Sequence, residues 1–173
     1  MIHQKIDANE MEVRAATVDD VPAIVDIYNH AVLHTTATAD YEPVTVEART
    51  AWLQDRNAKE YAVIVAVYEE KVVGWAALNP YYLRVGYRFT AENAVYIAPD
   101  FQGCGIGTLL LERLLECARV QGLHSIIAAI VATNPYSIAL HKRFGFVEVG
   151  RMREVVYKFD TWLDVVYLQW VSG

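Results

Sequence analysis

Residues 96–108 read YIAPDFQGCGIGT, and this stretch decides the fold. Its first residues favour a strand that stops at Pro99, its middle is a glycine-rich turn, and a helical pattern begins after Gly105. A helix N-terminus presents several unpaired backbone N–H groups, with the positive end of the helix dipole behind them. Glycines in such a turn let phosphate oxygens come close to those groups. The stretch therefore predicts an anion cradle that suits a pyrophosphate.

The spacing within the turn excludes two common phosphate-binding motifs. No Lys-Ser/Thr pair follows Gly107, as a nucleoside triphosphate P-loop would require. The order is GxGxG, whereas dinucleotide-binding turns have GxGxxG. The alternative interpretation is that the glycines only form a tight turn between a strand and a helix.

The sequence on both sides of this stretch predicts a mixed sheet with helices. A Thr17/Asp20 capping box opens the first helix, and Thr45 caps the second. Apolar periodicity predicts helices over 21–32, 46–56, 106–118 and about 134–144, and strands over 61–68, 72–78, 94–98, 125–131, 155–159 and 163–170. Turns are expected at 69–71 and 160–161. The strand–helix–strand unit around residues 94–131 should form a right-handed parallel crossover.

Length and composition limit the function classes. The 173 residues, of which 54% are hydrophobic, predict one domain over 13–173, preceded by a polar extension, 1–12. The net charge of −6, without a basic block, disfavours nucleic acid as a partner. Cys104 and Cys117 suggest neither a disulfide framework nor a structural metal, and no segment suits export or a membrane span. A cytoplasmic protein without a metal is expected.

The resemblance to a family begins at Gln102, Gly105 and Gly107. Their order matches Q/R-x-x-G-x-G/A, the acetyl-CoA signature of the GNAT superfamily of N-acetyltransferases, and it stands in the expected strand–turn–helix context. The superfamily's second signature, N-x-x-A-x-x-F-Y-x-x-x-G-F, is matched by Asn134, Leu140, His141, Gly145 and Phe146. Residues 13–170 also resemble one subgroup, the phosphinothricin and methionine sulfoximine/sulfone acetyltransferases. The stretches that carry the subgroup likeness are 27–32, 90–97, 140–146 and 158–164.

This resemblance implies a fold and a cofactor. The fold is of the α/β (α+β) class: a single GNAT-like domain whose mixed central sheet carries helices on both faces. In the family the sheet splays beside the strand equivalent to 94–98, and the pantetheine arm of acetyl-CoA inserts there. The residues implied to bind the cofactor are Val95, Tyr96, Ile97, Gln102, Gly103, Cys104, Gly105, Ile106, Gly107, Thr108 and Asn134.

The resemblance also implies catalytic and acceptor-binding residues. Glu92 matches the family's general base in T-x-E-x-x-V-Y-V, although a lone glutamate that opens a strand is usually an exposed charge. His141 occupies the place of a tyrosine acid in many members, and it could equally be structural. A small amino acid's carboxylate suits an arginine. The residues expected to bind the acceptor are Tyr28, Tyr82, Arg84, Tyr87, Arg88, Glu92 and Asn93. Ordinary core packing is the alternative for Tyr28.

The function expected from these residues is direct transfer of an acetyl group from acetyl-CoA to the amine of a small amino acid or analogue. Phosphinothricin, methionine sulfoximine and methionine sulfone are the expected analogues, which implies detoxification. Two alternatives stay open: a protein or peptide N-terminal acetyltransferase, and a non-enzymatic acyl-CoA sensor. A homodimer is expected because the family commonly forms one.

Overall fold

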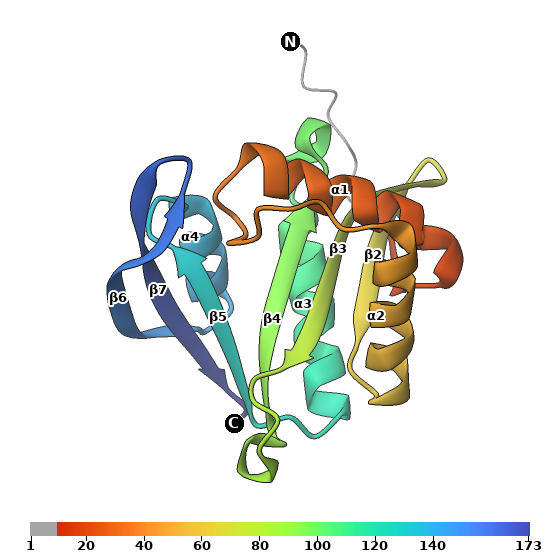
Figure 1. Cartoon of the computed structure of the whole chain (residues 1–173). Coiled ribbons are helices and arrows are strands. Elements are labelled where there is room, and N and C mark those ends of the chain that lie inside the picture. Colours follow the sequence, from red (N-terminus) through yellow and green to blue (C-terminus); the bar gives the residue numbers. More distant parts are fainter. Residues whose placement is uncertain (1–9) are drawn as a thin grey trace.

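The computed structural model describes residues 10–173, and its centre is a seven-stranded sheet in the order β1-β2-β3-β4-β5-β7-β6 (Figure 1). Its strands are β1 Glu12–Ala15, β2 Val63–Tyr68, β3 Lys71–Pro80, β4 Thr90–Ile97, β5 Ser125–Val131, β6 Val147–Lys158 and β7 Thr161–Val171. Only β4 and β5 pair in parallel, and the other neighbours are antiparallel. The predicted mixed sheet is confirmed. The predicted extension falls mostly on residues 1–9, which lie outside the described residues, and Glu12 already belongs to β1.

Helices cover both faces of the sheet, as expected. On one face lie α1 Val21–His34 and α2 Val46–Ala58, and on the other lie α3 Ile106–Val120 and α4 Pro135–Arg143 (Figure 1). The caps read from the sequence are present. The backbone N–H of Thr17 donates to Asp20 Oδ2 at 2.8 Å, and Thr45 Oγ1 accepts from the N–H of Ala48 at 3.1 Å. Each bond satisfies a backbone donor near a helix start that has no partner within the helix.

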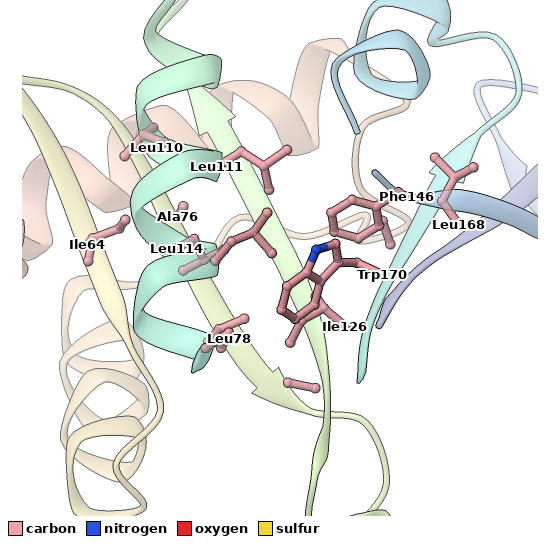
Figure 2. Packing of buried hydrophobic residues seen from close by; sticks show 14 of the residues in the cluster. Ile64, Ala76, Leu78, Leu110, Leu111, Leu114, Ile126, Phe146, Leu168 and Trp170 are labelled. Carbon is pink, nitrogen blue, oxygen red and sulfur yellow. The ribbon is translucent and has the colours of Figure 1, made fainter. Parts of the chain in front are cut away.

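The leucine-rich helix α3 anchors the core that lies under the cradle. Its buried stripe packs against β3, β5 and β7, where Leu78, Ile126 and Trp170 meet it (Figure 2). The buried residues of the helix are Ile106, Leu110, Leu111, Leu114, Leu115 and Ala118. Removal of a buried leucine side chain costs about 2–5 kcal/mol, so this packing fixes the position of the helix N-terminus.

The parallel pair β4–β5 opens after three residue pairs. Thr90, Ala91 and Glu92 are in register with Ser125, Ile126 and Ile127, and no pairing continues beyond them. The two ribbons diverge toward the C-terminal end of β4, as Figure 1 shows. The remaining residues of β4 pair with β3 alone, so one edge of the strand stays open. The expected splay of the sheet is present.

Several element limits differ from the sequence expectation. Strand β4 begins at Thr90 rather than at residue 94, and β6 begins at Val147 rather than at 155. Strand β6 is the edge of the sheet, and most of it is exposed, so it lacks the alternation that marks a half-buried strand. The turn after β6 is formed by Phe159 and Asp160, both with positive φ, one residue earlier than expected.

Candidate active site

A cavity of about 340 Å³ lies where β4 and β5 separate. It is bordered by both strands, by the segment that joins α1 to α2, by α4 and by the hairpin β6–β7. Its lining residues are Thr36, Ala37, Thr38, Ala39, Asn79, Glu92, Asn93, Ala94, Val95, Tyr96, Ala128, Ala129, Ile130, Val131, Asn134, Ser137, His141, Val155, Val156, Val165 and Tyr167. The open strand edge therefore meets several side chains that are expected to act on the cofactor or the acceptor.

Consecutive side chains of β4 point to opposite faces of the sheet beside this cavity. Side chains alternate along a strand, and Val95 and Ile97 pack into the core under α3, whereas Ala94 and Tyr96 pack with α1 and α2. Glu92 accordingly lies on the face of α1 and α2. Asn93 lies on the face of α3 and α4. The cavity thus joins the two faces through the gap in the sheet.

Glu92 presents a carboxylate that is partly withdrawn from water. Burial raises the pKa of this carboxyl above its ordinary value, because desolvation disfavours the charged form. No hydrogen bond or ion pair from the rest of residues 10–173 engages the carboxylate. A carboxylate that is free to accept a proton and has a raised pKa suits a general base.

His141 is buried on α4, and both of its ring nitrogens have partners. Its Nδ1 lies 2.8 Å from the carbonyl oxygen of Ser137, which can only accept, so Nδ1 carries the hydrogen. Its Nε2 lies 2.8 Å from Asn93 Nδ2, and in the neutral ring Nε2 accepts from that amide. Burial lowers the pKa of His141, although the bond to Ser137 opposes this shift. This pair of partners fits a neutral imidazole with its hydrogen on Nδ1.

The orientation of the Asn93 amide follows from this bond. Because Nδ2 donates to His141, Oδ1 points away from the ring, and it is buried without a partner among the described residues. A buried oxygen without a partner is costly and uncommon. Asn93 lines the cavity, and its Oδ1 is a buried acceptor whose bonding capacity is unused.

The glycine-rich turn has the free donors that a phosphate cradle needs. Gly103 and Gly105 have φ values of 79° and 83°, in the left-handed region that favours glycine. The backbone N–H groups of residues 103–107 donate to no acceptor among residues 10–173, whereas those of Thr108 and Leu109 donate to the Gly105 carbonyl. Five consecutive free N–H groups at the start of α3 fit a diphosphate. The residues present thus suit acetyl-CoA.

Gly107 and Asn134 hold the surrounding elements in place. A Cβ atom on Gly107 would stand 3.1 Å from Leu140 Cδ2, so glycine permits α3 and α4 to pack closely. Asn134 caps α4, where its Oδ1 accepts from the N–H of Ser137 at 3.1 Å. The Asn134 Nδ2 group makes no bond to another described residue and lines the same cavity as Asn93.

The structure does not bring every expected acceptor-binding residue to the cavity. Tyr82, Arg84, Tyr87 and Arg88 lie on the exposed loop between β3 and β4, beyond the paired end of β4 and β5. Tyr28 is buried against Trp75 and Tyr96, which matches the core-packing alternative. No lysine or arginine is among the described residues that line the cavity.

Sequence reasoning missed the segment 35–45, which borders the cavity on the side of Glu92. Three buried or half-buried side chains fasten it: Asn29 exchanges two bonds with Val44, the Tyr28 hydroxyl bonds to Asp40 and to Thr38, and Lys158 Nζ donates to the Thr38 carbonyl at 2.8 Å. Lys158 is only 2% exposed. A short run of Thr and Ala between two helices has no periodicity, and only an unusual lysine in a strand hinted at this contact.

The part of the chain that is described holds neither a cluster of metal-ligating side chains nor a membrane-spanning helix. Between residues 10 and 173 no three His, Cys, Asp or Glu side chains gather closely enough to hold an ion. No helix in this range is long and apolar enough to cross a bilayer.

Comparisons with known proteins identify the family. The model of the acetyltransferase (GNAT) family matches residues 24–146. A methionine sulfoximine/methionine sulfone acetyltransferase of Pseudomonas aeruginosa is 42% identical over 158 residues, which cover 91% of this chain and 92% of that protein. A phosphinothricin acetyltransferase of Sinorhizobium meliloti, solved in complex with acetyl-CoA, is 32% identical with a TM-score of 0.92 and covers 95% of this chain and 89% of that one.

A third relative is named for another acceptor. The structure of a ribosomal-protein-alanine N-acetyltransferase of Brucella melitensis is 42% identical, has a TM-score of 0.91, and covers 93% of this chain and 99% of that one. All three relatives are acetyltransferases that match the chain almost from end to end. The expected cofactor and enzyme class are confirmed. This chain belongs to the GNAT family of acetyltransferases.

Proposed function

We propose that this enzyme transfers the acetyl group of acetyl-CoA to the amine of a small amino acid or analogue, such as methionine sulfoximine, methionine sulfone or phosphinothricin. The single observation that carries the proposal is the cavity of about 340 Å³ at the open edge of β4. It is large enough for a small acceptor beside the end of a pantetheine arm. Relatives named for such acceptors support the same substrate class.

Glu92 is the proposed catalytic base. An ammonium group has no lone pair, so it must lose a proton before it can attack the thioester carbonyl. The raised pKa of Glu92 makes its carboxylate a better proton acceptor than an ordinary glutamate. Bound acetyl-CoA supplies the activated acetyl group and a thiolate leaving group.

The backbone binds the cofactor on the other side of the gap. The N–H groups of residues 103–107 hold the diphosphate, and the open edge of β4 at Val95 and Ile97 pairs with the pantetheine arm. A backbone N–H on this edge polarises the thioester carbonyl, as in an oxyanion hole. His141 has no free N–H in this tautomer, because its one ring hydrogen lies on Nδ1 and is bonded to the Ser137 carbonyl. Proton donation from Nε2 would require that atom to gain a proton and the bond from Asn93 to break.

An N-terminal acetyltransferase of proteins is the second candidate function, and the Brucella relative supports it. A peptide acceptor needs a groove that is open at both ends. Here the segment 35–45 is fastened by Lys158, Asn29 and Tyr28 beside the cavity. This fixed wall on one side of the cavity favours a small acceptor.

Steady-state kinetics with matched acceptors separate the alternatives. We expect saturable acetylation of methionine sulfone, methionine sulfoximine or phosphinothricin, and kcat/KM at least tenfold lower for a short peptide that begins with alanine. Turnover of the peptide alone would contradict the proposal in favour of the second function. Acetyl-CoA binding by calorimetry without turnover of any acceptor would instead support a non-enzymatic sensor.

We further propose a cytoplasmic homodimer whose role is detoxification. Exposed apolar side chains on the edge strand β6, among them Val147, Val149 and Met152, support a self-association surface. The free thiols of Cys104 and Cys117 suit a reducing compartment. Sedimentation equilibrium tests the dimer, and a monomer at micromolar concentration would contradict it.

A further inference from the structure

Asn93 is a cavity residue whose hydrogen-bonding capacity is only half used. Its Nδ2 group donates to His141 Nε2 at 2.8 Å, whereas its Oδ1 atom is buried and has no partner among the described residues. Rotation of the amide would give Oδ1 to the ring but would need a hydrogen on Nε2. Nδ1 already carries a hydrogen for the Ser137 carbonyl, so the rotated amide fits only a charged imidazole. A neutral ring therefore holds Oδ1 on the side away from the imidazole, where it keeps an unused bonding capacity.

The face of the sheet on which Asn93 lies indicates which ligand its Oδ1 atom binds. Asn93 lies on the side of α3 and α4, with the cradle and Asn134, whereas Glu92 and the segment 35–45 lie on the other side. An acceptor amine must reach Glu92, so a ligand atom at Asn93 belongs to the cofactor arm. The Asn134 Nδ2 group is a free donor in the same cavity, and Asn93 Oδ1 is a free acceptor. Together they complement the amide groups of a pantetheine arm.

We propose that Asn93 Oδ1 accepts a hydrogen bond from the cysteamine amide N–H of acetyl-CoA, and that His141 acts through Asn93 as a positioning residue. This bond sets how far the arm enters the gap, and it places the thioester at the inner end of the gap, next to Glu92. The amide nearest the sulfur is assigned because Asn93 lies at the inner end of the gap, one residue beyond the last β4–β5 pair. The inference rests on the proposed function, since it needs the arm in this gap.

Calorimetry with coenzyme A and an analogue tests the assignment without turnover. The analogue replaces the cysteamine amide N–H by an ester oxygen and leaves the rest of the molecule unchanged. We expect the wild-type protein to bind coenzyme A about tenfold more tightly than the ester, the scale of one hydrogen bond to a buried acceptor. Asn93→Ala should bind both ligands with the same Kd.

The matched control is Asn79→Ala. Asn79 also lines the cavity, and its Oδ1 already accepts from Arg56 Nε at 3.0 Å. We expect this variant to keep the tenfold preference for the amide. Equal loss of preference in both variants would show that any change in the cavity suffices, and it would overturn the role of Asn93.

Two substitutions at His141 test the positioning role and serve as a second route should Asn93→Ala fail to fold. His141→Gln keeps an oxygen that accepts from Asn93 Nδ2, and His141→Leu removes it. We expect the preference for the amide to survive in the glutamine variant and to fall to about twofold or less in the leucine variant. An equal preference for the amide in the two variants would overturn the positioning role of His141.

The remaining outcomes separate this inference from the proposed function. A wild-type protein that binds coenzyme A and its ester equally would overturn the inference and leave the acetyltransferase proposal standing. An Asn93→Ala variant whose KM rises for the amino acid, with an unchanged Kd for coenzyme A, would assign Oδ1 to the acceptor instead. Failure of the wild-type protein to bind coenzyme A at all would remove both proposals.

Discussion

Glu92 and His141 border one cavity from opposite faces of the sheet. Glu92 projects toward α1 and α2, whereas His141 reaches the cavity from α4 and contacts Asn93, the residue that follows Glu92. Alternation along β4 produces this separation. In the proposed mechanism the acceptor and the cofactor use separate sides of a single gap and meet where β4 and β5 stop pairing.

Replacement of the base should affect turnover and spare the cofactor. We expect Glu92→Gln to lower kcat by a factor of about 10²–10⁴, the usual contribution of a general base, and to leave the acetyl-CoA Kd within twofold. Glu112→Gln, at an exposed position on α3, is the matched control with unchanged kinetics. Wild-type turnover in Glu92→Gln would remove this residue from the mechanism.

The pH profile should carry the signature of the same carboxyl. Burial raises the pKa of Glu92 above 4.5, and the base must be ionised, so kcat/KM should fall as the pH drops through the raised pKa. The midpoint of this acidic limb should therefore lie above 4.5. A limb with its midpoint at or below 4.5 would show that Glu92 does not govern the profile.

Ionisation of Glu92, which activity requires, should lower the folding stability. The unfolded chain ionises Glu92 near 4.5, whereas the folded chain holds the proton to a higher pH, so ionisation destabilises the fold above 4.5. We expect Glu92→Gln to raise the Tm at pH 8, with the gain shrinking toward pH 4. Thermal melts at both values measure this difference, and a lower Tm at pH 8 would contradict it.

The cradle should tolerate no side chain at its left-handed glycine. Gly105 has φ +83° and open space around it, so Gly105→Val costs about 1–2 kcal/mol of backbone strain without a clash in the fold. We expect the protein to stay folded and the acetyl-CoA Kd to rise at least tenfold. Gly86→Val, on the exposed loop, is the control, and unchanged affinity of Gly105→Val by calorimetry would argue against the cradle.

Loss of the lysine that fastens the segment 35–45 should weaken acceptor binding. Lys158→Met keeps an apolar chain of similar length but removes the bond to the Thr38 carbonyl. We expect the KM for the amino acid to rise severalfold and the Kd for acetyl-CoA to stay unchanged. Lys142→Met, at an exposed ion pair with Glu148, controls for the lost charge. A selective rise in the acetyl-CoA Kd would contradict this role of Lys158.

The sequence predicts the elements that local rules govern. The periodicity of residues 106–118, the Thr45 cap and the Thr17/Asp20 capping box act over a few residues, and each appears in the structure. The free amides of residues 103–107 also follow from the turn, since glycines at positive φ direct the chain into α3.

Long-range placement was beyond the reach of the sequence. Lys158 and Thr38 are 120 positions apart, and no local pattern joins them. The bond between Asn93 and His141 depends on how α4 packs against the sheet. Strand β6 is the edge strand, pairs with β7 alone and is largely exposed. Backbone hydrogen bonds to β7 hold it in the sheet, so its sequence needs no apolar alternation. Tyr82, Arg84, Tyr87 and Arg88 were expected at the acceptor, and none of them lines the cavity.

A crystal structure with bound acetyl-CoA tests the central claim most directly. The account predicts diphosphate oxygens within hydrogen-bond distance of the N–H groups of residues 103–107, and the pantetheine arm between β4 and β5 with its thioester near Glu92. A cofactor bound on another face, or a diphosphate held by side chains while these N–H groups turn toward the protein, would contradict it.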